Sequence, residues 1–333
     1  MHAHPAASSP EDVAAPAIEL RGLFKVYRGG RGRPDKVALH GIDFTVPRGA
    51  FFGLLGPNGA GKSTTINILA GLVVKTAGTV RVLGVDLDER PRLVRRLMGV
   101  VPQELNIDAF FTPRETLEYQ AGLYGVPKHR RRTDELLEAL GLSDVADAYA
   151  RTLSGGMRRR LLVAKALVHD PPVVILDEPT AGVDVELRRQ LWAYMKRLNA
   201  RGTTVVLTTH YLEEAEALCG QVAIIDHGRL VACGATRELV ARLDEKELRV
   251  RTEPPVDGLP EVLRALGFSV DDGWLVVRYR PSRTRIGDLL EAVRAAGFAV
   301  RDLATREPDL EELFLRLVAR GREDRTPEPA SAP

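Results

Sequence analysis

The residues at positions 56–63 combine types that can hold an anion. They read Gly-Pro-Asn-Gly-Ala-Gly-Lys-Ser and fit the pattern G-x-x-x-x-G-K-[ST] of a phosphate-binding loop. Glycines let backbone N–H groups converge on phosphate oxygens, and a helix that begins near Gly61 directs its positive end to the same anion. Lys62 can then bridge the β- and γ-phosphates, and the Ser63 hydroxyl can ligate Mg²⁺. The loop predicts a nucleoside triphosphate site but does not say which process the nucleotide drives.

Two adjacent carboxylates, Asp177 and Glu178, follow the apolar run at 173–176. A P-loop enzyme holds Mg²⁺ with an aspartate at the end of such a buried strand. Because neighbouring residues of a strand face opposite sides, Glu178 can address a different atom, such as the oxygen of an attacking water. The pair by itself fits solvated carboxylates at a loop start equally well. The phosphate-binding loop upstream favours nucleotide hydrolysis.

Tyr27 is an aromatic residue in the first strand region, two residues after Lys25. Its ring can stack on an adenine base, or it can be a half-buried aromatic of the strand. Because the same chain carries a phosphate-binding loop, stacking on adenine is the preferred interpretation.

The hydrophobic pattern predicts an α/β arrangement that would position these residues. Short alternating strands between residues 18 and 46 indicate an antiparallel sheet that leads into a buried strand at 51–55. Further strands are expected at 79–85 and 98–101, with an arginine-rich helix at 89–96 between them.

Residues 113–169 have helical periodicity, and Pro113 suits the first turn of the first helix. The basic run at 128–132 is read as a solvated helix start, with a membrane-facing or partner-binding role as the alternative. A second helix carries Leu136, Leu137 and Leu140 on one face and stops at Gly141.

The apolar run before Asp177 is typical of a central strand in a parallel sheet. We expect the following elements after it: a helix around 187–198, a strand at 204–207, a helix at 212–218 and strands at 222–225 and 229–232.

Residues 247–320 repeat strand and helix signals on a smaller scale, in the order βαββαβ plus a final helix. This order indicates a small α+β, ferredoxin-like module of the split-βαβ type, and nothing in it resembles a catalytic site. The expected organisation is a disordered leader at 1–15, a nucleotide-binding domain at 16–243, this accessory domain at 246–320 and a disordered tail at 321–333.

Composition excludes several classes of protein. The 47 basic and 45 acidic residues nearly cancel, so no nucleic-acid footprint appears. No run approaches the roughly 18 apolar residues of a membrane span, and the first residues lack the pattern of a signal peptide. Cys219 and Cys233 give neither metal spacing nor a disulfide framework, which favours reduced thiols in a cytosolic protein.

Further motifs make the chain resemble the ATP-binding-cassette (ABC) family across residues 17–240. Leu153-Ser154-Gly155-Gly156 lies between the phosphate-binding loop and the acidic strand, with Gln103 before it and His210 after it. The stretches 101–104, 177–184 and 208–215 further resemble the ATPase subunits of ABC-2-type exporters, as does Leu310-Glu311-Glu312-Leu313-Phe314 in the accessory module. The implied fold is a P-loop NTPase cassette with a RecA-like core, an antiparallel β subdomain and an α-helical subdomain at about 105–169.

The resemblance implies a head-to-tail homodimer with two ATP molecules, each with Mg²⁺, between the subunits. Ser154, Gly155 and Gly156 would bind the γ-phosphate held by the other subunit, which agrees with backbone donors at a helix N-terminus. The implied cofactor-binding residues are Tyr27, Gly56, Pro57, Asn58, Gly59, Ala60, Gly61, Lys62, Ser63, Thr64, Ser154, Gly155, Gly156 and Asp184.

The resemblance also assigns the catalytic roles. Glu178 would polarise the attacking water, and His210 would contact the γ-phosphate. Gln103 would sense Mg²⁺ and water and relay to a membrane partner, and Asp184 would cross the interface. Ser63, Gln103 and Asp177 form the implied metal set.

Two departures from the common family pattern leave these groups in place. Met157 replaces the glutamine that commonly follows Leu-Ser-Gly-Gly, and residues 181–184 differ from the commonest Ser-Ala-Leu-Asp. We therefore expect an active ATPase that drives a separate ABC-2-type permease from the cytoplasmic face of the membrane, without nucleic acid. The alternative is a soluble ABC ATPase of cofactor assembly or another process without transport, which leaves the accessory module unexplained.

Overall fold

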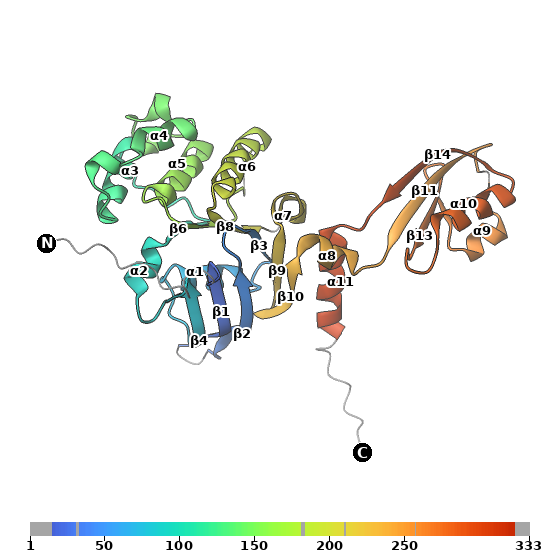
Figure 1. Cartoon of the computed structure of the whole chain (residues 1–333), viewed down its shortest axis with the longest axis horizontal. Helices are drawn as coiled ribbons and strands as arrows, with labels where there is room; N and C mark the ends of the chain where they lie inside the picture. The colour runs from blue at the N-terminus through green and yellow to red at the C-terminus, as the bar shows by residue number, and fades with distance from the viewer. Residues whose placement is uncertain (1–14, 31–32, 181–183, 210, 257, 324–333) are drawn as a thin grey trace, which may run out of the picture. The chain divides into compact units, whose positions relative to one another are not determined.

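The computed structural model describes residues 15–30, 33–180, 184–209, 211–256 and 258–323 (Figure 1). Contacts between residues divide the chain into two compact units, 1–234 and 235–333, which are described separately below.

A six-stranded sheet forms the centre of the first unit, in the order β10-β9-β3-β8-β7-β6. Its strands are β3 (Phe51–Leu55), β6 (Met98–Val101), β7 (Val173–Asp177), β8 (Thr204–Thr209), β9 (Gln221–Asp226) and β10 (Arg229–Ala235). The pairs β3/β8, β3/β9, β7/β8 and β6/β7 are parallel. Every residue of β3, β7 and β8 is buried, which fits the largely apolar sequences of β3 and β7 and the apolar centre of β8. Their carboxyl ends share one edge, so the residues that follow them gather there.

A second, antiparallel sheet has the order β2-β1-β4-β5. It is built from β1 (Ile18–Tyr27), β2 (Lys36–Val46), β4 (Ala77–Val82) and β5 (Val85–Asp86). The expected single strand at 79–85 is wrong: positive φ angles at Leu83 and Gly84 reverse the chain, and Val82 pairs with Val85. Apolar side chains of both sheets, such as Leu20 and Phe52, belong to one buried core.

Helices flank the sheets of the first unit (Figure 1). They are α1 (Lys62–Leu69), α2 (Pro91–Arg96), α3 (Pro113–Leu123), α4 (Thr133–Ala139), α5 (Gly155–Leu167), α6 (Val185–Ala200) and α7 (Leu212–Leu218), with short 3₁₀ turns at Lys128–Arg130, Ser143–Val145 and Ala150–Thr152. Pro113 occupies the first turn of α3 behind a capping box at Thr112, as expected. The helices α3, α4 and α5 form the predicted helical segment, and Arg131 and Arg132 of its basic run pair with nearby carboxylates.

The second unit contains a four-stranded antiparallel sheet, in the order β12-β13-β11-β14. The unit comprises α8 (Thr236–Ala241), β11 (Lys246–Glu253), α9 (Glu261–Ala265), β12 (Ser269–Asp271), β13 (Trp274–Tyr279), α10 (Ile286–Ala295), β14 (Ala299–Arg306) and α11 (Leu310–Glu323). Strand β13 lies between β11 and β12, which α9 connects, so the sheet has the split-βαβ order. Leu248 and Leu275 lie in its separate core. Helix α8 is an addition to the expected elements.

Candidate functional site

Steric constraints shape the phosphate-binding loop, which connects β3 to α1. A Cβ atom at Gly56 would lie 2.1 Å from the backbone oxygen of Ile225. Gly61 is the N-cap of α1 and has φ +112, a conformation that favours glycine. The loop therefore turns tightly against the carboxyl end of β9 and leads its backbone N–H groups into the first turn of α1.

Lys62 is the first residue of α1 and is buried. Its Nζ donates to the backbone oxygen of Gly56 at 2.7 Å and to that of Pro57 at 3.2 Å. Burial lowers the pKa of the Lys62 ammonium, while the charges of Glu178 and Asp177 act in the opposite direction. The loop thus holds the Lys62 ammonium against its own backbone oxygens at the start of a helix, whose positive end suits a polyanion.

Asp177 is buried at the end of β7, as the apolar run predicts. One carboxylate oxygen accepts from Thr208 Oγ1 at 2.6 Å, and Ser63 also hydrogen-bonds this carboxylate. Burial raises the pKa of Asp177, and the negative charge of Glu178 raises it further. The hydrogen bonds to Thr208 and Ser63 and the positive charge of Lys62 lower the pKa of Asp177. A carboxylate and a hydroxyl from two different elements meet here, and hard oxygen donors of this kind fit Mg²⁺.

Glu178 has a left-handed backbone conformation, with φ +46, that its sequence position did not indicate. Its N–H is held by both the backbone oxygen of Thr208, at 3.2 Å, and the hydroxyl of Thr208, at 3.0 Å. Such a conformation costs on the order of 1–3 kcal/mol in a residue other than glycine, so the surroundings must impose it. The Glu178 carboxylate accepts a hydrogen bond from Gln103 Nε2 at 3.1 Å, whereas the Asp177 carboxylate accepts from Thr208.

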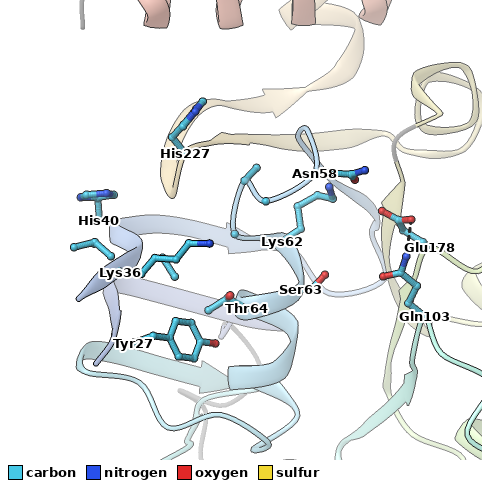
Figure 2. Close-up of a pocket in the computed structure, with 15 residues that line it drawn as sticks. Tyr27, Lys36, His40, Asn58, Lys62, Ser63, Thr64, Gln103, Glu178 and His227 are labelled. Carbon is cyan, nitrogen blue, oxygen red and sulfur yellow. Dashed lines mark hydrogen bonds between the residues drawn. The ribbon is translucent and has the colours of Figure 1, made fainter. Parts of the chain in front are cut away.

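A cavity of about 560 Å³ brings most of these groups together (Figure 2). Tyr27 and Lys36 lie on one side of it, Gln103 and Glu178 on the other, and Lys62 between them. The lining residues are Tyr27, Lys36, Val37, Ala38, His40, Asn58, Gly59, Ala60, Gly61, Lys62, Ser63, Thr64, Gln103, Glu178 and His227.

Lys36, His40 and His227 were not predicted from the sequence as lining residues. Pairing of β1 with β2 places Lys36 opposite Tyr27, so the register of this hairpin was the available signal. His227 comes from the turn after β9, where the N–H of Gly228 donates to the oxygen of Ala60 at 2.8 Å. Local sequence carries no sign of this contact.

Some predicted residues lie outside the cavity. Ser154 is the exposed N-cap of α5, where its Oγ accepts from the N–H of Met157 at 3.2 Å, and Gly155 and Gly156 begin that helix. Asp184 is the exposed N-cap of α6 and accepts from the N–H of Leu187 at 2.8 Å. His210 lies outside the described residues, between Thr209 and Tyr211.

Arg159 is a further residue that the sequence did not single out. It is buried in α5, and its guanidinium donates to the backbone oxygens of Pro102 at 2.9 Å and Gln103 at 2.8 Å. Burial lowers its pKa, and the charge of Asp177 opposes this. Arg159 therefore connects α5, whose N-cap is Ser154, to the segment that contains Gln103, the hydrogen-bond donor to Glu178.

Comparisons with known proteins show the family of the chain. The family model described as ABC transporter matches residues 39–181. The chain is 40% identical to the daunorubicin/doxorubicin resistance ATP-binding protein DrrA of Streptomyces peucetius, over 95% of this chain and 96% of that protein. It is 39% identical to the Nod factor export ATP-binding protein I of Rhizobium sp. (strain N33), over 92% of this chain and 98% of that protein.

Solved structures also match the chain. One, an ATP-binding subunit of an ABC transporter, is 30% identical with a TM-score of 0.61 and covers 68% of this chain and 93% of its own. Another, a dimeric ATP-binding cassette in a post-hydrolysis state with ADP and Pi, is 26% identical with a TM-score of 0.59, covering 66% of this chain and 98% of its own. The chain belongs to the ABC transporter family, as an ATP-hydrolysing, ATP-binding subunit of the exporter type.

Proposed function

We propose that the chain works as a head-to-tail homodimer that holds two ATP molecules with Mg²⁺ and drives a separate ABC-2-type permease from the cytoplasmic face of the membrane. The observation that carries the proposal is the division of the predicted residues into two sets. The cavity supplies one set, whereas Ser154 and Asp184 stand exposed at helix N-termini outside it. A second copy would bring its Ser154 helix to the phosphate end of this cavity, where a dipole end favours an anion.

The order of groups across the cavity supports a nucleotide that lies with its base at Tyr27 and its γ-phosphate at Glu178. Lys62 and Ser63 lie between these two residues in Figure 2. Lys25 Nζ lies 4.7 Å from the centre of the Tyr27 ring, so adenine would stack on the opposite ring face. Ser63 and Asp177 would hold Mg²⁺, which neutralises charge on the phosphates. Glu178, oriented by Gln103, would take the proton of the attacking water, and His210 would contact the γ-phosphate.

A groove on the first unit offers a docking site for the permease. It has a volume of about 280 Å³ and includes Leu72, Tyr124, Arg95 and Lys165 in its lining. Leu72 in this lining is 75% exposed, and two residues of α3 outside the lining, Tyr119 and Leu123, are 60% and 66% exposed.

An amphipathic segment of the permease that carries apolar residues and a carboxylate would match this lining. Pro102 also lines the groove, one residue before Gln103, so a bound segment could shift Gln103 and thereby its hydrogen bond to Glu178.

In the part of the chain that the structure describes, no helix is long and apolar enough to cross a membrane.

The test is Glu178→Gln in the full chain, with Glu291→Gln as a matched control at an exposed site on α10. We expect Glu178→Gln to abolish steady-state ATP hydrolysis, to keep ATP binding and to stabilise the dimer, because glutamine cannot accept the proton of water. The control should hydrolyse ATP like the wild type. Normal turnover in Glu178→Gln would refute the role of Glu178.

The permease is tested by affinity purification of tagged Glu178→Gln protein from detergent-solubilised membranes, with ATP and Mg²⁺ present. A stoichiometric membrane protein with several spans supports the transport role. A soluble complex without a membrane protein would leave the ATPase in place and overturn the assignment to a permease.

A further inference from the structure

Glu214 is a buried carboxylate on α7 that lies outside the cavity and was not among the predicted site residues. Its side chain is held by three different segments of the first unit. Oε2 accepts from Thr180 Oγ1 at 3.0 Å and from Thr209 Oγ1 at 3.4 Å, and Oε1 lies 3.3 Å from Arg188 Nε. Only 9% of the residue is exposed.

Each of these partners adjoins a group proposed for catalysis. Thr180 follows Glu178 by two residues, and Thr209 immediately precedes His210. Arg188 lies in α6, where its N–H bonds to the backbone oxygen of Asp184, the N-cap. One carboxylate thus connects the three chain segments that carry the proposed water-activating, phosphate-contacting and interface-crossing residues.

A second link runs through Arg188. Its guanidinium carbon lies 5.3 Å from the centre of the Tyr211 ring, and the N–H of Tyr211 donates to Thr209 Oγ1 at 2.9 Å. Two described residues, Thr209 and Tyr211, are therefore linked to α6, Thr209 through Glu214 and Tyr211 through Arg188.

A buried ion pair is a costly way to fill this space, because both charges lose water, and apolar residues of similar volume often do as well or better. Burial raises the pKa of Glu214, whereas the bond from Thr180 and the charge of Arg188 act against that rise. What the carboxylate provides is a specific geometry: Oε2 accepts from two threonine hydroxyls, and Oε1 forms an ion pair with Arg188, so its partners come from three segments.

We propose that Glu214 is a positioning residue that couples the start of α6 to the end of β8, the strand that precedes His210 in the sequence, so that both take up their active arrangement together when ATP is bound. The proposal rests on the proposed roles of Asp184 and His210. Glu214 touches neither nucleotide nor water in this assignment and acts only through its partners.

The test is Glu214→Gln, which preserves size but removes the charge that faces Arg188. We expect kcat for ATP hydrolysis to fall about 10- to 100-fold, the usual cost of displacing catalytic groups without removing them. ATP affinity, measured separately on the same protein, should stay within about 3-fold, because the cavity is unchanged. Thr209→Val, which removes only the hydroxyl next to His210, should reproduce part of the loss in kcat.

The matched control is Glu118→Gln in α3. Glu118 also accepts from a threonine hydroxyl and an arginine, Thr133 and Arg131, but in the helical segment away from the cavity. We expect it to lower thermal stability without changing kcat. A wild-type kcat in folded Glu214→Gln would overturn the proposal, as would equal losses of kcat and ATP affinity in Glu214→Gln and the control. Failure of the ATPase assignment itself is distinguishable, because it would appear as turnover in Glu178→Gln.

Discussion

Replacing Arg159 with methionine separates stability from catalysis at the segment that holds Gln103. Arg159→Met removes two hydrogen bonds from a charged donor to backbone oxygens, at 2.9 and 2.8 Å, and keeps a long side chain in a buried position. Such bonds are worth about 1.5–3 kcal/mol each, or roughly 3–6 kcal/mol together. Removing a buried charge returns several kcal/mol. The net loss in free energy of unfolding should be at most about 2 kcal/mol, which corresponds to a decrease in Tm of no more than about 8 °C.

The loss of activity should exceed what this destabilisation explains. Without Arg159 the backbone at Gln103 is released, and the bond from Gln103 Nε2 to Glu178 is no longer held in place. We expect kcat for ATP hydrolysis to fall about 10- to 100-fold, with ATP affinity within a factor of about three.

Arg160→Met supplies the control on the same helix. Arg160 also donates to two backbone oxygens, those of Leu140 at 2.8 Å and Gly141 at 2.9 Å, which belong to the helical segment and not to the site. The two variants should have comparable melting temperatures, but only Arg159→Met should lose turnover in a steady-state assay at a temperature where both are folded. Equal turnover in the two variants would refute the reasoning.

Two further predictions concern a cap and a thiol. Ser154→Ala and Thr112→Ala each remove a helix N-cap and should each lower the free energy of unfolding by about 1 kcal/mol. Only Ser154→Ala should also lose ATP-driven dimerisation, measured by light scattering. If Thr112→Ala lost dimerisation as well, the loss would come from helix capping alone. Burial raises the pKa of the Cys219 thiol to about 12, so at pH 8 an alkylating reagent should label exposed Cys233 but not Cys219 until urea unfolds the chain, as mass spectrometry would show. Because the folded pKa is the higher one, stability from Cys219 is full below the ordinary thiol pKa and is lost as pH rises towards 12.

The parts of the site that the sequence predicted are those encoded over short distances. The loop at 56–63 specifies its own turn and the start of α1, and the run before Asp177 specifies a strand buried on both faces. Strand alternation was the wrong reason to separate Asp177 from Glu178, because β7 ends at Asp177 and Glu178 has a left-handed backbone, but each carboxylate does have its own partner. The order of elements in the second unit was predicted for the same reason, since each short strand and helix has its own pattern.

The parts that escaped prediction depend on contacts between distant segments. His227 reaches the cavity only because the turn after β9 packs on Ala60, and the left-handed backbone of Glu178 depends on Thr208 of the neighbouring strand. Arg159 appears in the sequence as one of three consecutive arginines, and only the packing of α5 distinguishes it from its neighbours. Glu214 likewise resembles any acidic residue of a helix until three segments converge on it.

The pairing of β3 has a consequence for synthesis on the ribosome. Phe51 pairs with Val205 on one side and Phe52 with Gln221 on the other, so both neighbours of the strand before the phosphate-binding loop emerge much later than the strand itself. The antiparallel sheet can close once residue 86 is available, whereas β3 must wait, apolar along its whole length, while the helical segment is made. A nascent chain that stops before β9 has the loop but lacks one of the two strands that pair with β3, so we expect it to bind ATP only after β9 has been made.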